Sequence, residues 1–231
     1  MESMKKIIFG IFAHPDDEAF GPAGTLINEV RAGAELHLIS FTAGDAGTNP
    51  DNVPDLGTVR EQEWRKAGSL MGASSMHLLN YRDGHLDNQT MIEATDRISQ
   101  IVHSVIDNTP EDIVVEFMSL DLNGYTGHID HIVAARTACQ VFYRLKATDT
   151  RFSRIRLACL PRSVVPTMST DWIFMESGRS DAEINETIDA RHQKDIILNV
   201  MDAHYSQRAD RDYTLKSQGN NLGLNYFIVL D

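Results

Sequence analysis

The chain has 231 residues, with 21 lysine and arginine side chains against 33 aspartate and glutamate side chains, for a formal net charge of −12. This acidic balance argues against nucleic acid or an anionic membrane as the main partner, but it allows a small anionic substrate in a local basic pocket. The length fits a single domain over residues 1–231. No stretch approaches the roughly 18 apolar residues of a membrane span.

The N-terminus superficially imitates a signal peptide, because Lys5 and Lys6 precede a short apolar run. The run ends in the acidic segment 16–18 rather than at a small-residue cleavage site, so we interpret it as the first strand. The two cysteines, Cys139 and Cys159, suit a reducing compartment in which buried thiols are more common than disulfides. We therefore expect a cytoplasmic protein.

Strand and helix signals alternate along the chain. In chain order, the sequence predicts a strand at 7–13, a helix at 23–34, a strand at 36–41, a helix at 58–71 and a strand at 77–79. A helix at 91–107, a strand at 113–117 and a helix at 128–145 follow. The last third contains predicted strands at 154–160 and 172–175, a helix at 194–204 and a strand at 226–229. This alternation is typical of an α/β fold, a Rossmann-like three-layer sandwich with a mostly parallel sheet. Functional side chains of such folds lie at the carboxyl ends of the strands.

The predicted first strand runs directly into His14-Pro15-Asp16-Asp17-Glu18, which places one imidazole and three carboxylates within five residues. A charged cluster at the edge of a core must be solvated, paired or bound to metal, because uncompensated buried carboxylates are costly. The glycine-rich loop at 42–50 follows the second strand but lacks the dinucleotide-binding fingerprint, so we exclude a nicotinamide cofactor.

A second candidate motif, His128-Ile129-Asp130-His131, opens the predicted helix after the fourth strand. Taken alone, each motif has an ordinary explanation, because a strand-end aspartate often caps a helix and paired histidines are often surface residues. Both motifs follow parallel strands, so they converge on one crevice. Two histidines and one carboxylate would supply the three protein ligands of a hydrolytic zinc site. A non-haem iron(II) enzyme uses the same ligand set, and a non-catalytic sugar- or metal-binding protein is a further alternative.

The sequence resembles the LmbE-like or PIG-L family of zinc-dependent N-acetylglucosaminyl de-N-acetylases. The resemblance covers nearly the whole chain and rests on the segments 13–18, 21–24, 42–47, 127–131, Arg60-x-x-Glu63, Asp83-Gly84 and His204-x-Ser206-Gln207. It implies a metal hydrolase acting on a linear amide, which removes acetyl from an N-acetylglucosamine-type sugar or conjugate. A small-molecule substrate and a homo-oligomeric assembly are expected with it.

The resemblance also implies roles for four residues of the two motifs. His14, Asp17 and His131 would bind zinc, with iron(II) as the alternative metal. Asp16 would be the general base that takes a proton from the metal-bound water, whose pKa the ion lowers. Attack of this water on the amide carbonyl would give a tetrahedral oxyanion.

Five further residues receive roles from the resemblance, each beside a plainer alternative. His128 would act as an imidazolium that stabilises the oxyanion or protonates the amine, with Asp130 supporting its charge or interacting with the helix dipole. Tyr125 would contact the oxyanion or pack within its loop. Arg60 and Asp83 would contact sugar hydroxyls, or be a helix-surface arginine and a turn aspartate.

Overall fold

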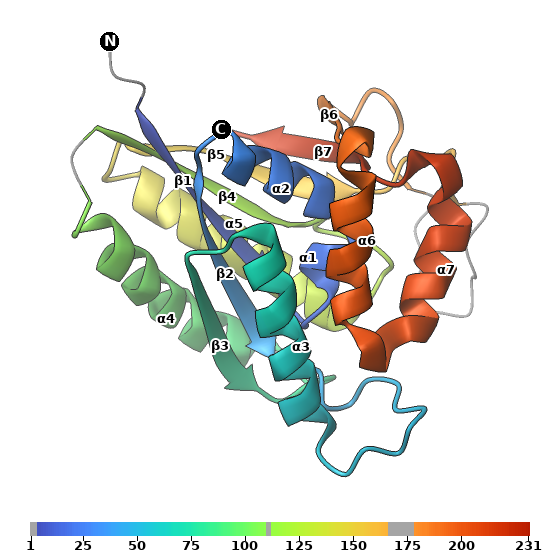
Figure 1. Ribbon diagram of the computed structural model, residues 1–231. Helices are drawn as coiled ribbons and strands as arrows, with labels where there is room; N and C mark the ends of the chain where they lie inside the picture. Colours follow the sequence, from blue (N-terminus) through green and yellow to red (C-terminus); the bar gives the residue numbers. More distant parts are fainter. Residues whose placement is uncertain (1–3, 110–111, 166–177) are drawn as a thin grey trace.

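The computed structural model describes residues 4–109, 112–165 and 178–231 (Figure 1). The described residues form a seven-stranded sheet in the order β3-β2-β1-β4-β5-β7-β6. The strands are β1 (Lys5–Phe12), β2 (Glu35–Thr42), β3 (Ser75–Tyr81), β4 (Ile113–Leu120), β5 (Phe152–Cys159), β6 (Glu186–Asp189) and β7 (Leu224–Leu230). Strands β1 to β5 pair in parallel, whereas β7 is antiparallel to both β5 and β6. The α/β class with a mostly parallel sheet is therefore confirmed.

Helices cover both faces of this sheet and complete the expected three layers (Figure 1). They are α1 (Asp17–Phe20), α2 (Ala23–Arg31), α3 (Leu56–Met71), α4 (Asn88–Ile106), α5 (Ile129–Lys146), α6 (Lys194–Ala203) and α7 (Arg208–Gln218). Apolar side chains of α4 and α5 pack against one face, and those of α2, α3 and α6 pack against the other. Among the described residues, no helix is both long enough and apolar enough to cross a membrane.

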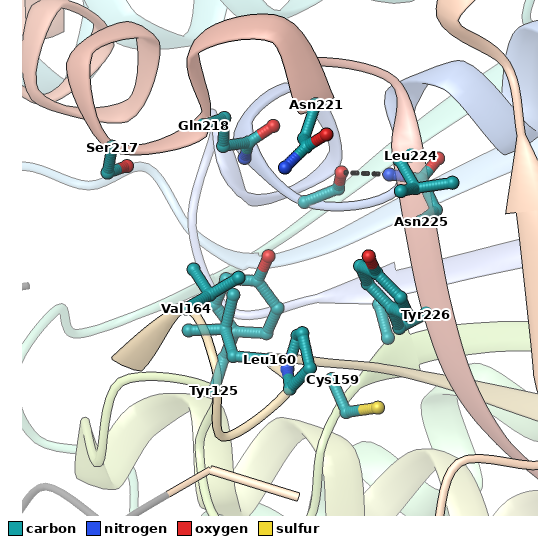
Figure 2. Close-up of a pocket in the computed structure, with 13 residues that line it drawn as sticks. Tyr125, Cys159, Leu160, Val164, Ser217, Gln218, Asn221, Leu224, Asn225 and Tyr226 are labelled. Carbon is teal, nitrogen blue, oxygen red and sulfur yellow. Dashed lines mark hydrogen bonds between the residues drawn. The ribbon is translucent and has the colours of Figure 1, made fainter. Parts of the chain in front are cut away.

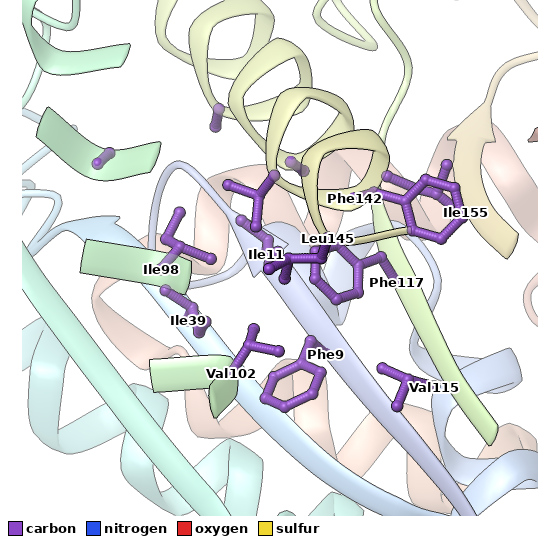
Figure 3. Close-up of a cluster of buried hydrophobic side chains, with 14 of the residues drawn as sticks. Phe9, Ile11, Ile39, Ile98, Val102, Val115, Phe117, Phe142, Leu145 and Ile155 are labelled. Carbon is purple, nitrogen blue, oxygen red and sulfur yellow. The ribbon is translucent and has the colours of Figure 1, made fainter. Parts of the chain in front are cut away.

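The central strands are buried on both faces, which explains their continuous apolar runs. In β4, Val115 and Phe117 point toward α4 and α5, whereas Met118 points toward the opposite helices. Figure 3 shows Phe117 beneath α5, near Phe9 of β1 and Phe142 of α5. The ring centroids of Phe9 and Phe117 lie 5.7 Å apart, and those of Phe117 and Phe142 lie 5.8 Å apart. This packing fixes the neighbouring ends of β1 and β4.

Sequence reasoning missed the short helix α1, strand β6 and helix α7, and it misplaced some ends. Strand β6 has four residues with alternating partial burial, and α7 has no fully buried residue, so neither carries a strong apolar pattern. Helix α4 begins before its predicted start, because Asp87 and Thr90 form a capping box there. The strand predicted at 172–175 lies outside the described residues.

Candidate metal centre and active site

The first motif forms a tight turn between β1 and α1. The Asp17 carboxylate accepts hydrogen bonds from the backbone amides of Ala13 and His14, both at 3.0 Å. Asp16 has a φ of 118°, which L side chains rarely adopt. Such strained backbone is concentrated at functional sites, where the surrounding structure enforces it. The turn therefore holds Asp16 and Asp17 in fixed and different directions.

The second motif begins α5. His128 is the N-cap residue, and its Nδ1 accepts a hydrogen bond from the Asp130 backbone amide at 3.2 Å. His131 lies in the first turn, with Nδ1 3.0 Å from the Gly124 carbonyl oxygen. Gly124 has a φ of 81°, and a Cβ there would lie 2.6 Å from the His128 carbonyl oxygen. A glycine is therefore required for the loop to aim His131.

The two motifs meet because β1 and β4 are neighbours and end at the same edge of the sheet. His131 Nε2 lies 3.0 Å from His14 Nδ1 and 3.1 Å from Asp17 Oδ1. His14 Nδ1 lies 3.9 Å from Asp17 Oδ2. A ring nitrogen of His128 lies within 4.8 Å of ring nitrogens of both other histidines. The structure thus brings together the three predicted metal ligands, with His128 beside them.

The hydrogen-bond partners of the two ligand histidines determine which nitrogens carry protons. His14 Nε2 lies 2.9 Å from Asp83 Oδ1, and His131 Nδ1 faces a carbonyl oxygen, so both of these nitrogens must donate. In neutral rings, His14 Nδ1 and His131 Nε2 would then present lone pairs to each other. A cation or an additional proton is needed between them. The donor set of two imidazoles and one carboxylate therefore fits zinc or iron(II).

The pKa values of the same residues indicate that this position favours positive charge. Burial alone would lower the pKa of His14, but hydrogen bonds to Asp130 and Asp83 and the charge of Asp17 raise it to about 10. Burial would raise the pKa of Asp17, but His131 and His14 outweigh this effect and hold it well below its usual range. Both shifts stabilise a cationic centre between carboxylates.

Asp16 is held by Arg60 rather than by the histidines. Arg60 Nη2 lies 2.8 Å from Asp16 Oδ2 and donates to the Pro15 carbonyl oxygen at 2.6 Å, and Nη1 donates to the Gly44 carbonyl oxygen at 2.9 Å. Burial raises the pKa of Asp16 to about 6, although the Arg60 charge opposes the shift. Arg60 is 4% exposed and is covered by the glycine-rich loop. It lines the cavity, as expected for a sugar contact, but these hydrogen bonds all go to the protein.

Asp83 and Asp130 lie behind His14. Asp83 Oδ2 also accepts a hydrogen bond from the Ala46 amide at 2.8 Å, and hydrogen bonding to His14 helps to lower the pKa of Asp83 to about 2 despite burial. Asp130 accepts from the amides of Gly84 and Leu86 and lies 3.4 Å from His14 Nε2. Sequence reasoning assigned Asp83 to the sugar and Asp130 to His128. The structure shows both carboxylates in contact with His14, a predicted metal ligand, and carboxylates commonly orient histidine ligands in this way.

His128 differs from the imidazolium that the resemblance implies. Burial and the charges of His131 and His14 lower its pKa to about 4. Its Nδ1 accepts a backbone hydrogen bond at the N-terminus of α5, where the helix dipole disfavours positive charge. These surroundings favour a neutral ring with its proton on Nε2.

Tyr125 lies half-buried on the cavity wall. Its φ is 63°, and its backbone amide donates to Asn123 Oδ1 at 3.0 Å. Burial raises the pKa of its hydroxyl, so the hydroxyl stays protonated. The structure places Tyr125 on the cavity wall and packs it against the core, and its contact with an oxyanion stays a prediction.

A second layer of contacts explains the distant motif at 204–207. His204 Nε2 lies 2.9 Å from Glu18 Oε1, and both side chains are fully buried. Glu18 Oε2 in turn accepts from the Asp16 amide at 3.2 Å. Ser206 donates through its backbone amide and its hydroxyl to the Glu63 carboxylate, at 2.9 and 2.6 Å. Sequence reasoning treated His204 mainly as a packing residue, whereas its ring supports the turn that carries Asp16.

A cavity of about 510 Å³ opens beside the predicted ligands. The two motifs line one side, and α7 lines the other with Asp210, Tyr213, Ser217 and Gln218 among its residues. Sequence reasoning did not identify any residue of α7. The helix has a polar cavity face and a polar solvent face, so the sequence offers no apolar stripe that would have revealed it.

The family model and two relatives that match this chain are all described as deacetylases of N-acetylglucosamine conjugates. A family model described as "PIG-L: GlcNAc-PI de-N-acetylase" matches residues 9–142, which include both motifs. A Bacillus anthracis protein named probable N-acetyl-alpha-D-glucosaminyl L-malate deacetylase 2 is 24% identical over 216 residues, covering 90% of this chain and 84% of the relative. A Mycolicibacterium vanbaalenii protein named 1D-myo-inositol 2-acetamido-2-deoxy-alpha-D-glucopyranoside deacetylase is 26% identical over 230 residues, covering 85% and 79%.

Among solved structures, the fold is similar to that of an N,N'-diacetylchitobiose deacetylase from Pyrococcus horikoshii. The TM-score is 0.68 at 18% sequence identity, with coverage of 98% of this chain and 84% of the other. At this identity the likeness supports the fold, and the chemistry must be argued from the site.

Proposed function

Because the chain belongs to the PIG-L family of de-N-acetylases, we propose that it is a metal-dependent amidohydrolase that removes acetyl from an N-acetylglucosamine-type sugar conjugate. One observation carries the proposal: His131 Nε2 lies beside both His14 Nδ1 and Asp17 Oδ1, while the neighbouring Asp16 is turned toward Arg60. The site therefore separates a ligand carboxylate from a carboxylate available for proton transfer.

His14, Asp17 and His131 would hold the ion, which we propose to be zinc, with iron(II) as the alternative. When bound, the ion would lower the pKa of a water molecule and polarise the acetamide carbonyl. Asp83, Asp130 and the Gly124 carbonyl oxygen keep the ligand rings in the required tautomers.

Asp16 takes a proton during attack on the acetamide, and Arg60 fixes the orientation of its carboxylate. His128 presents Nε2–H toward the reacting group, because its Nδ1 is occupied by the Asp130 amide. It can thus donate a hydrogen bond to the developing oxyanion. Tyr125, on the same cavity wall, would supply its hydroxyl as a second donor to this region.

We also propose a cellular location, a domain organisation and an oligomeric state for the chain. Cys139 and Cys159 are both free in the structure, in accord with a reducing cytoplasm. We treat residues 1–231 as one catalytic domain. A homo-oligomer remains a prediction, which analytical ultracentrifugation tests.

The proposal is tested by acetate release from N-acetylglucosamine and its malate, inositol and β-1,4-linked N-acetylglucosamine conjugates. Protein loaded with zinc or with iron(II) should release acetate from at least one of them and should contain about one metal ion per chain. His131→Ala should lose the metal, whereas His103→Ala, at an exposed position on α4, should keep it. Acetate release from none of the substrates would refute the proposed activity. Full metal occupancy in His131→Ala would refute the ligand set.

A further inference from the structure

The corner between α6 and α7, residues 204–207, contains the motif His204-x-Ser206-Gln207, to which the proposed function assigns no role. All three side chains are polar and buried, with exposed fractions of 0%, 5% and 2%. Burying polar groups is costly unless they form hydrogen bonds, so their partners indicate what the corner does. These partners belong to three separate elements, namely α1, α3 and the loop between β2 and α3.

His204 supports the backbone of the proposed general base. Its Nε2 lies 2.9 Å from Glu18 Oε1, and Glu18 Oε2 accepts a hydrogen bond from the Asp16 amide at 3.2 Å. Asp16 is the N-cap residue of α1, but its side chain forms no capping hydrogen bond, and its φ of 118° is strained. Strained backbone persists only where the surrounding structure holds it. Glu18 provides such a contact, and His204 fixes Glu18.

Ser206 restrains the helix that carries Arg60. Its backbone amide and its hydroxyl both donate to the Glu63 carboxylate, at 2.9 and 2.6 Å. Glu63 lies three residues after Arg60 on α3, so the two side chains project from neighbouring positions of one helix face. Arg60 in turn orients the Asp16 carboxylate through Nη2. The contact with Ser206 therefore bears on the direction of the proposed base.

Gln207 restrains the glycine-rich loop that covers Arg60. Its Nε2 donates to the Thr48 carbonyl oxygen at 3.0 Å. Earlier in this loop, the Gly44 carbonyl oxygen accepts a hydrogen bond from Arg60 Nη1 at 2.9 Å. A Cβ at Gly44 or at Gly47 would collide with the guanidinium, so the loop and the arginine are in close contact. A loop held in this position limits where Arg60 can move.

Two of the three corner residues do not reach the substrate cavity. The described residues that line it include Gln207 but neither His204 nor Ser206. Beyond the corner, α7 forms the cavity wall, and Figure 2 shows Gln218 at its far end, across a side recess from Tyr125. His204 and Ser206 can therefore act on the reaction only through the residues that they hold.

Resting on the proposed function, we propose that His204, Ser206 and Gln207 are positioning residues that together hold the Asp16–Arg60 pair in place beside the metal ligands. His204 fixes the backbone of the base, and the other two residues fix the arginine that orients its carboxylate. A loosened corner should lower kcat and leave KM and metal content unchanged, because the substrate contacts and the ligands remain.

The test compares His204→Met with wild type, using zinc-loaded protein and whichever of the malate, inositol and β-1,4-linked N-acetylglucosamine conjugates wild type cleaves fastest. Methionine fills the space but cannot donate to Glu18. We expect kcat to fall by about 10- to 100-fold, because small displacements of a catalytic group have effects of this size. KM and metal content should stay within about twofold of wild type. His204→Gln, whose amide can donate from nearly the position of Nε2, should recover most of the lost kcat.

Hydrogen exchange gives a measurement that does not depend on the substrate. The amides of residues 16–20 should exchange faster in His204→Met than in wild type and regain protection in His204→Gln. His37→Met is the matched control, because His37 is also buried, with Nε2 3.1 Å from Glu35 Oε1, but lies toward the amino end of β2. In the folded protein it should change neither kcat nor the exchange of residues 16–20.

Ser206→Ala is a second variant that keeps the backbone hydrogen bond to Glu63 and loses the one from the hydroxyl. It should fold even if His204→Met does not, because Glu63 retains a donor. Its kcat should fall by about three- to tenfold at unchanged KM. Ser99→Ala, whose hydroxyl donates to the Thr95 carbonyl oxygen within α4, should keep the wild-type kcat.

Wild-type kcat in Ser206→Ala, or in folded His204→Met, would overturn the positioning role and leave the deacetylase intact. The same conclusion would follow from a loss that appears in KM or metal content instead of kcat, or from a loss of kcat in His37→Met as large as that in His204→Met. Failure of wild type to release acetate from any of the conjugates or from free N-acetylglucosamine would instead overturn the proposed function, and this inference with it.

Discussion

Within the described residues, an ionic cluster lies at each end of the parallel strands, and the two clusters differ in their balance of positive and negative charge. The sheet network lies toward the strands' amino ends and consists of Lys6, Glu29, Glu116, Arg154, Arg156 and Glu186. Arg156 is its centre, with Nη1 2.6 Å from Glu29 Oε1 and Nε 2.7 Å from Glu186 Oε2. Three cations face three carboxylates, so the formal charges of the network balance.

The candidate site at the carboxyl ends is not balanced. Asp16, Asp17, Asp83 and Asp130 are all buried, and Arg60 is the permanent cation that faces them. Histidines fill the remaining space and supply positive charge only when they take up a proton. A balanced ionic cluster can stabilise the fold by itself, whereas a cluster short of positive charge accords with the cation that we propose for this site.

Asp16→Asn should give the largest effect on kcat. It distinguishes a catalytic role of this carboxylate from a role in balancing the charge of the site. The proposed general base is lost while the three proposed ligands remain, so kcat should fall by about 10²–10⁴-fold with the metal content unchanged. Acetate-release kinetics and elemental analysis measure the two quantities. Asp45→Asn, at an exposed loop position, is the matched control and should retain full activity. Undiminished kcat in Asp16→Asn would remove the residue from the mechanism.

Arg156→Met removes the central cation of the sheet network and tests its contribution to stability. Three carboxylates lose a partner that is 3% exposed, so the free energy of unfolding should drop by about 3–5 kcal/mol. The folded fraction should keep the wild-type kcat, because the network is remote from the site. Denaturant titration measures the loss, and Arg211→Met, in an exposed ion pair, should cost less than about 1 kcal/mol. Equal losses of unfolding free energy in the two variants would show that the sheet network stabilises the protein no more than an exposed ion pair does.

Zinc that binds the candidate site should stabilise the folded protein. At a free zinc concentration 100 times its Kd, the folded state should gain about 2.7 kcal/mol, and a chelator should reverse the gain. Thermal unfolding with and without zinc measures it. Asp17→Asn should abolish the response, whereas Glu29→Gln, in the sheet network, should retain it. A response that survives in Asp17→Asn would place the ion elsewhere.

The smallest expected effect is the pH dependence of the stability that the sheet network contributes. Burial alone would raise the pKa of Glu29, but Lys6 and Arg156 outweigh it and hold the pKa below its usual 4.5. A lowered folded-state pKa contributes stability above pH 4.5, which is lost as the pH falls through the folded value.

Glu29→Gln should therefore be less stable than wild type at about pH 7, and this difference should shrink by about pH 3. Urea unfolding at the two pH values measures it. Glu61→Gln, in a surface pair with Arg65, should differ little from wild type at either pH. A constant difference for Glu29→Gln would contradict the assigned coupling.

The parts of the fold that depend on local sequence pattern could be predicted before the structure was known. Continuous apolar runs identified β1, β2 and β4 because strands of a buried parallel sheet carry no polar face. The acidic turn and the histidine pair could be assigned to one site because parallel neighbours end at the same edge of a sheet. Those inferences need only the order of residues along the chain.

The partner of each site carboxylate could not be predicted from the sequence, because it depends on distances between residues far apart in the chain. Asp83 and Asp130 turn out to hold His14, and Arg60 to hold Asp16, through contacts spanning more than 40 residues each. The same holds for α7, whose residues acquire meaning only from the cavity opposite them. A hydrogen-bond partner that is distant in sequence leaves no periodic signal, so only the folded chain reveals it.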